Sequence, residues 1–162
     1  MCAHTDPLAA LGPNLNMDGV RQYWTDGYAA VRKTNDVAVV IHDAFQPITS
    51  WNGFMKSGFN NVILDTHQYQ VFSPEQVAMS IDSHVSAACG LGKQIAASDK
   101  WTVVGEWSGA RTDCAKWLNG VGRGTRYEGT FSGTKVLGNC ARRAAGSISQ
   151  FPLSEQQKTR RL

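Results

Sequence analysis

Residues 60–77 read NNVILDTHQYQVFSPEQV, and this stretch decides the fold class. An apolar run of three residues from Val62 gives way to polar and aromatic residues, as at the carboxyl end of a strand that is buried on both faces. The segment 73–76 then supplies a serine N-cap, a proline at the first helical position and the glutamine of a capping box. The stretch therefore predicts a strand that leads through a polar segment into a helix.

Two more strands of the same character are expected on either side of this stretch. Residues 37–41 (VAVVI) form a β-branched run that ends in His42 and Asp43, and residues 101–104 (WTVV) lead into a segment that contains Glu106. Strands that alternate with helices pair in parallel through right-handed crossovers. We therefore expect an α/β fold in which all three strand ends contribute to one site.

Helices are predicted before the first strand and after the capping box. Residues 17–33 carry apolar side chains at helical spacing, with Asn16 or Asp18 available as the N-cap. The second helix carries its apolar side chains on one face and is expected to stop near Gly90 and Gly92.

The chain after the third strand is expected to be mostly loop. Six glycines fall between positions 120 and 138, which indicates a long excursion rather than another strand and helix. Residues 153–162 are expected to begin a helix.

Composition excludes several classes of protein. With 42% apolar and 18% charged residues, the 162-residue chain is expected to be globular rather than disordered. No apolar run reaches the roughly 18 residues of a membrane span, and the N-terminus shows no signal peptide. The net charge of +3 comes mostly from the end of the chain, and no basic stripe with interleaved aromatics is present, so no nucleic-acid partner is expected. The basic residues of this end are Arg142, Arg143, Lys158, Arg160 and Arg161.

Glu106 is the main candidate for chemistry, because it directly follows an apolar strand and precedes Trp107. A carboxylate at such a position is costly without a partner or a function, although a glutamate at a solvated strand end is the simpler alternative. His67 and Tyr69 alternate along an extended segment, so both are expected to point to one side and to aim a carboxylate. His42 is a weaker candidate, and for all three the alternative is a satisfied polar residue of the core.

Metal and serine-hydrolase chemistry fit the sequence less well. His42, His67, His84 and Cys89 have no spacing that suits a closed metal site, and Ser108 lacks the nucleophile elbow of serine hydrolases. We predict no metal site and no cofactor. The cysteines lack C-x-x-C spacing, which leaves disulfides and buried thiols open. They are Cys2, Cys89, Cys114 and Cys140.

Several stretches of the chain resemble the fungal exo-β-1,3-glucanases (glucan 1,3-β-glucosidases) of glycoside hydrolase family 5. The match runs in order from about residue 11 to residue 161, and its last three motifs together are specific. The stretches are LGPNLNMD (11–18), VVIHDAFQ (39–46), YQVF (69–72), VVGEWS (103–108), TDCAKWLNG (112–120) and RGTRYEG (123–129).

The resemblance implies a (β/α)8 barrel that is secreted to the cell wall and releases glucose from β-1,3-glucan with retention of configuration. Retention needs two carboxyl groups about 5 to 5.5 Å apart. Glu106 matches the family's nucleophile, and His67 and Tyr69 match its active-site histidine and tyrosine.

Other matches bear on sugar binding and on stability. Phe72 matches an aromatic that stacks on sugar rings, and Trp107 and His42 are taken as further substrate-binding residues. Cys114 and Cys140 match a family disulfide, whose chain-entropy contribution would be roughly 3 kcal/mol. Cys89 would pair in the family with a cysteine that this chain lacks.

The sequence also departs from the family. Where the family has the Asn-Glu-Pro motif of its acid/base glutamate, the divergent segment 1–10 ends in Leu8, Ala9 and Ala10, so the proton donor is absent. The chain matches about strands five to seven of the barrel, without the N-terminal half and the last strand. We therefore expect one incomplete barrel domain over 1–162, with a basic tail over 141–162.

The functional hypothesis is a retaining exo-β-1,3-glucosidase by family, in a chain whose activity is impaired. The alternatives are a non-catalytic carbohydrate-binding remnant and a fragment without function of its own. The expected partner is β-1,3-glucan or a related oligosaccharide, with no nucleic acid, no membrane and a monomeric state. The family implies an extracellular or cell-wall location.

Overall fold

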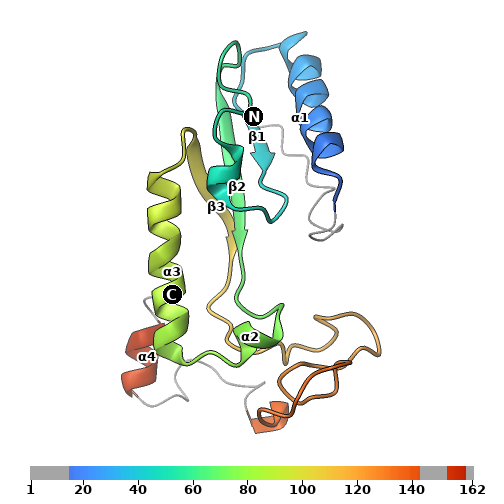
Figure 1. The fold of residues 1–162 in the computed structure, drawn as a ribbon, viewed down its shortest axis with the longest axis vertical. Helices are drawn as coiled ribbons and strands as arrows, with labels where there is room; N and C mark the ends of the chain where they lie inside the picture. Colours follow the sequence, from blue (N-terminus) through green and yellow to red (C-terminus); the bar gives the residue numbers. More distant parts are fainter. Residues whose placement is uncertain (1–14, 143–152, 160–162) are drawn as a thin grey trace. The chain divides into compact units, whose positions relative to one another are not determined.

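Three strands form one sheet in the order β1-β2-β3: β1 (Val39–His42), β2 (Val62–Gln68) and β3 (Trp101–Trp107). The structure is a computed structural model that describes residues 15–142 and 153–159. β1 and β2 pair in parallel, with Val39 opposite Val62 and His42 opposite Asp65. All three arrows point the same way in Figure 1. The predicted α/β class with a parallel sheet is therefore confirmed.

The strands extend further into the polar segments than their apolar runs predicted. β2 continues through Asp65, Thr66 and His67 to Gln68, and β3 continues through Glu106 to Trp107. Ladder hydrogen bonds use only the backbone, so polar side chains do not end a strand if they find partners of their own. Conversely, β1 begins at Val39, two residues later than the predicted start.

The first helix agrees with the sequence. Helix α1 (Met17–Arg32) begins after Asn16, whose side chain accepts a hydrogen bond from the Asp18 N–H. Its buried side chains lie four residues apart on one face, which packs against β1 (Figure 1). These side chains are Val20, Trp24 and Tyr28.

The second predicted helix is two helices. The capping box forms, with the Gln76 N–H bonded to the Ser73 hydroxyl, but α2 (Pro74–Val77) is short. A second helix, α3 (Ile81–Ala96), begins where the Ser80 hydroxyl accepts from the Ser83 N–H. α3 then runs through Gly90 and Gly92, so the predicted stop was wrong. A helix tolerates each interior glycine at a cost of about 1 kcal/mol.

The described residues belong to two compact units, Met1–His67 with Gly92–Glu106 and Gln68–Leu91 with Trp107–Leu162. In the first unit, β1 and β2 bury Ile41 and Leu64 together with side chains from α1 and from η1 (Ile48–Trp51). At the end of α1, Arg32 donates a hydrogen bond to the carbonyl of Val37, two residues before β1, at 2.8 Å. This core supports the carboxyl ends of the strands.

The second unit contains the predicted glycine-rich excursion, which has no helix or strand between Ser108 and Asn139. The Cys114–Cys140 disulfide closes it, as the family resemblance implied. Asp113, fully buried, accepts hydrogen bonds from the N–H groups of Arg126 and Tyr127 at 2.7 and 3.1 Å and from the Asn119 amide at 2.8 Å. One carboxylate therefore organises the loop from inside.

The end of the chain is described in part. A short 3-10 helix, η2 (Cys140–Arg142), follows the excursion, and the predicted C-terminal helix is α4 (Leu153–Thr159). Lys158 of α4 pairs with Asp82 of α3 at 2.7 Å. The divergent segment 1–10 and most of the basic tail lie outside the described residues. Among the described helices, none is long and apolar enough to cross a bilayer.

Asp113 provides a test of how the loop is held. Burial raises its pKa, but hydrogen bonds from Arg126, Tyr127 and Asn119 outweigh this and leave the pKa below its ordinary value of 3.8. Because the folded pKa is lowered, the stabilisation is complete above about pH 4 and is lost as the pH falls through the folded pKa. We expect the amides of Arg126 and Tyr127 to lose protection from hydrogen exchange in that acid range.

An Asp113→Asn variant is expected to lose this acid transition and about 2 kcal/mol of loop stability, because one oxygen cannot replace two. The exposed Asp36→Asn is the control and should leave both unchanged. Equal exchange rates in wild type and Asp113→Asn would contradict the assignment.

Candidate active site

A cluster of polar side chains lies at the carboxyl ends of the strands in the first unit. All but one are buried, which is costly unless each has a partner. The cluster consists of His42, Asp43, Asp65, Thr66, His67 and Glu106. Three of these were candidates from the sequence, and the parallel sheet brings them to one edge as expected.

Glu106 and His67 form the contact with the clearest chemical meaning. Nδ1 of His67 lies 2.9 Å from Oε2 of Glu106. The Glu106 side chain is 56% exposed, whereas that of His67 is 4% exposed. A buried imidazole nitrogen thus lies against one carboxylate oxygen, while the carboxylate remains open to a solute.

Asp65 lies behind this pair. Its Oδ2 is 3.3 Å from Nε2 of His67, and its Oδ1 accepts from the Gly105 N–H at 2.8 Å. Sequence reasoning missed Asp65, although residues 65 and 67 lie two positions apart on one strand and so share a face. Asp65 stands two residues before His67 in the sequence, and Tyr69 stands two residues after it. The alternation that singled out Tyr69 therefore applied to Asp65 as well.

His42 and Asp43 hold the end of β1. The His42 ring meets that of His67 edge to face, with ring centroids 4.3 Å apart, and its Nδ1 accepts from the Ala44 N–H. Asp43 accepts from the Phe45 N–H and from the Thr66 hydroxyl. Burial raises the pKa of Asp43, and these two hydrogen bonds only partly oppose the rise. His42 is buried, so its role in sugar binding stays a prediction.

Phe45 adds an aromatic surface that sequence reasoning did not single out. Its side chain is 40% exposed, and its ring centroid lies 5.1 Å from that of His42. Ala44 and Phe45 both adopt positive φ angles, of 51° and 58°. Such backbone is costly for side chains other than glycine and is often found at binding sites. The sequence signals were its place three residues after the end of β1 and its place in the stretch VVIHDAFQ (39–46).

The other predicted site residues belong to the second unit. Phe72 and Trp107 are 46% and 63% exposed, and the rings of Tyr69 and Phe72 meet edge to face with centroids 5.8 Å apart. The Phe72 N–H donates to the Gln76 side chain, so the capping box of α2 also fixes this aromatic. The structure therefore presents exposed aromatic side chains in both units.

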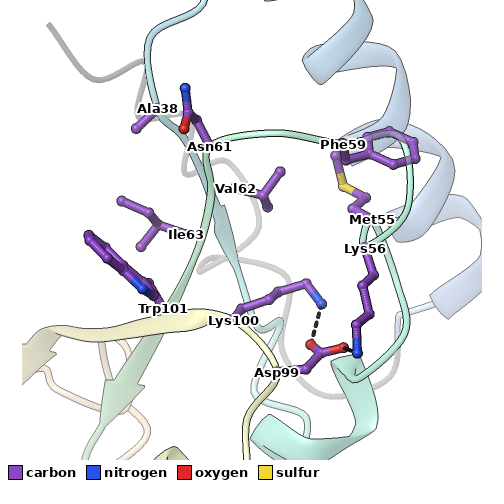
Figure 2. A pocket seen from close by; sticks show the side chains of 10 residues that line it. All are labelled: Ala38, Met55, Lys56, Phe59, Asn61, Val62, Ile63, Asp99, Lys100 and Trp101. Atoms are coloured by element: carbon purple, nitrogen blue, oxygen red, sulfur yellow. Dashed lines mark hydrogen bonds and ion pairs between the residues drawn. The ribbon is translucent and has the colours of Figure 1, made fainter.

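A cavity of about 360 Å³ lies at the opposite, amino ends of the strands (Figure 2). Its acidic residue, Asp99, lies 2.8 Å from Nζ of Lys100 and 3.6 Å from Nζ of Lys56. A carboxylate compensated by two lysines is a poor nucleophile, because its charge is already paired. The cavity therefore does not compete with Glu106 as a catalytic site.

Comparison with known proteins relates the chain to glycosidases. No protein-family model matches the chain. Curated proteins named glucan 1,3-beta-glucosidase are similar to it over most of its length, at 42–49% identity. The relationship predicted from the sequence motifs is confirmed.

Three fungal relatives show the extent of the match. The chain is 49% identical to the glucan 1,3-beta-glucosidase of Blumeria graminis over 86% of its length, and 47% identical to the probable glucan 1,3-beta-glucosidase A of Aspergillus niger over 98%. The Yarrowia lipolytica enzyme is 45% identical over 93%. The matches cover 34–40% of these relatives. The chain therefore corresponds to part of a fungal glucan 1,3-beta-glucosidase.

Gly105 tests how closely β2 and β3 approach at the site. A Cβ atom added to Gly105 would lie 2.8 Å from Cγ of Asp65, so the Asp65 carboxylate or β3 would have to move. We expect Gly105→Ala to lower the free energy of unfolding by about 2 kcal/mol, as overpacking does.

Gly27→Ala in α1 is the matched control. A Cβ at Gly27 would meet nothing within 4 Å, and alanine is favoured in a helix interior by about 1 kcal/mol. Chemical denaturation should therefore show opposite signs for the two variants. A stabilising Gly105→Ala would disprove the close approach of Asp65.

Proposed function

We propose that this chain carries the nucleophile side of a retaining exo-β-1,3-glucosidase site, with Glu106 as the nucleophile. The observation that carries the proposal is the exposed Glu106 carboxylate with one oxygen 2.9 Å from the buried His67 ring. The names of the similar fungal enzymes support β-1,3-glucan as the substrate class.

The proposed chemistry uses one oxygen of Glu106 to attack the anomeric carbon of a glucosyl residue. The carbon–oxygen bond to the next sugar breaks, its electron pair leaves with that oxygen, and a glucosyl ester forms on Glu106. Water then cleaves the ester. His67 orients the second oxygen, and Tyr69 is assigned to the same task by its match to the family tyrosine.

Proton donation is the part of the reaction for which this chain offers no clear residue. A sugar leaving group needs a general acid, and the positions aligned with the family's Asn-Glu-Pro motif are Leu8, Ala9 and Ala10. We therefore propose that turnover of glucan by this chain is impaired. A substrate whose leaving group departs without a proton should still react with Glu106.

The second unit is proposed to bind sugar rings through its exposed aromatic side chains. Phe72 and Trp107 each expose an aromatic side chain, and aromatic side chains are common in the lining of small-molecule sites. The parallel order of β1, β2 and β3, with polar groups at their carboxyl ends, supports the proposal that they form part of a (β/α)8 barrel.

We also propose an extracellular, monomeric protein that acts at the cell wall. The Cys114–Cys140 disulfide supports this location, because disulfides persist in oxidising compartments.

Covalent labelling tests the proposal directly. The probe is 2,4-dinitrophenyl 2-deoxy-2-fluoro-β-glucoside, whose phenolate leaves without a proton and whose fluorine slows hydrolysis of the ester. We expect the intact mass of the wild-type chain to rise by one deoxyfluoroglucosyl group, and peptide mapping to place that group on Glu106.

Two glutamate variants complete the experiment. Glu106→Gln removes the nucleophile and should abolish labelling, whereas Glu75→Gln, on the exposed surface of α2, should label like wild type. Labelling that persists in Glu106→Gln refutes the assignment. A chain that is retained by immobilised laminarin but never labelled would refute the hydrolase and favour the carbohydrate-binding alternative.

A further inference from the structure

We propose that His84 is a positioning residue for sugar binding in the second unit, because it fixes the segment of residues 69–72 from the start of α3. The inference rests on the proposed function, which assigns sugar binding to Phe72 in this segment. It is carried by two contacts with the side chain of Gln70. Nδ1 of His84 lies 2.8 Å from Oε1 of Gln70, and the Gln70 amino group donates to the His84 carbonyl at 3.3 Å.

The two contacts together assign the tautomer of His84. A carbonyl oxygen only accepts hydrogen bonds, so the amino group of Gln70 must face the His84 carbonyl, and Oε1 must then face the imidazole. Oε1 also only accepts, so Nδ1 of His84 carries hydrogen and donates it. With hydrogen on Nε2 only, either orientation of the amide would oppose two acceptors.

The surroundings of the other ring nitrogen favour a neutral imidazole. Nε2 of His84 is buried, and no residue in the described part of the chain gives it a hydrogen-bond partner. A hydrogen there would be a buried donor without an acceptor, which is costly. Burial, and after it the positive charge of Arg111, lowers the pKa of His84 below its ordinary value of 6.5. We therefore expect a neutral ring with its hydrogen on Nδ1.

Residues 69–72 are held from two sides. Gln76 of the capping box donates to the Tyr69 carbonyl at 3.4 Å and accepts from the Phe72 N–H at 2.8 Å. These bonds hold the two ends of the segment, and the contacts with α3 hold its middle, where Val71 is buried. Phe72 remains exposed on this fixed backbone. A side chain that is already in place binds more tightly, because ordering it on binding costs affinity.

Asparagine and glutamine at position 84 separate the hydrogen bond from the filling of space. The amino group of asparagine can take the place of the Nδ1–H group and donate to Gln70. Glutamine is longer and carries its amide near the place of Nε2, so we expect it to lose the contact. Both variants put a neutral amide in the same buried position and keep the main-chain carbonyl. Gln70→Met removes both contacts from the other side.

The first measurement is the tautomer of His84 in the full chain labelled with 15N-histidine. Its ring signals are assigned through bonds from the backbone, so the result needs no variant. We expect hydrogen on Nδ1 and none on Nε2 at neutral pH. Hydrogen on Nε2, alone or together with Nδ1, overturns the proposal.

The second measurement is the affinity for laminaritriose, determined by calorimetry and corrected for the folded fraction of each chain. We expect His84→Gln and Gln70→Met to bind roughly tenfold more weakly than wild type, because Phe72 must then be ordered on binding. His84→Asn should bind within about threefold of wild type, as should Ser86→Ala at an exposed position of α3. Wild-type affinity in His84→Gln or Gln70→Met, or an equal loss in His84→Asn, overturns the positioning role.

Hydrogen exchange of the Phe72 amide separates this inference from the proposed function. Exchange should be faster in His84→Gln and Gln70→Met than in wild type and His84→Asn, with or without sugar. If wild type does not bind laminaritriose, the proposed sugar binding of the second unit fails, and the tautomer and the exchange rates decide whether His84 holds residues 69–72. Exchange that is unchanged in His84→Gln and Gln70→Met overturns the inference even if wild type binds the sugar.

Discussion

The hydrogen bond from the Gly105 N–H to Oδ1 of Asp65 is the contact on which the candidate site depends. Glu106 follows Gly105 directly in β3, so this bond determines the position from which the Glu106 side chain projects. It requires glycine, because a Cβ at position 105 would occupy the space of the Asp65 carboxylate. Gly105 on β3 and the Asp65 carboxylate on β2 therefore together fix the distance between the two strands at the site.

Burial of so many polar groups needs compensation, and the compensation is local. Asp43 accepts hydrogen bonds from the Phe45 N–H and the Thr66 hydroxyl. Asp65 accepts one from the Gly105 N–H, and its other oxygen lies 3.3 Å from Nε2 of His67. Each carboxylate therefore offsets part of its desolvation and also fixes a neighbour. Ile41 and Leu64, both fully buried, belong to the apolar core of the same unit. Glu106, which is exposed, lies at the edge of the network and remains open to a solute.

The second unit contains a long segment without helix or strand, and individual side-chain contacts stabilise it. Its glycine-rich excursion is held by Asp113 from inside and by the Cys114–Cys140 disulfide at its ends. A loop without a helix or strand must satisfy its backbone N–H groups individually, and one buried carboxylate satisfies those of Arg126 and Tyr127. At the candidate site, too, side-chain carboxylates accept hydrogen bonds from backbone N–H groups, those of Phe45 and Gly105.

The sequence by itself determined the α/β class, the three strands and the candidacy of Glu106 and His67, and it narrowed the N-cap of α1 to Asn16 or Asp18. These follow from apolar runs, capping residues and motifs, all of which are local signals. The sequence could not separate α2 from α3, because a break of three residues between good helix formers leaves no strong signal, and it could not exclude that α3 continues past Gly90. Only the tertiary structure brought His67 to Glu106, the Gly105 N–H to Asp65 and the His42 ring to that of His67, because these contacts depend on register across β1, β2 and β3. Register is decided by the packing of whole strands, and no single stretch of sequence contains it.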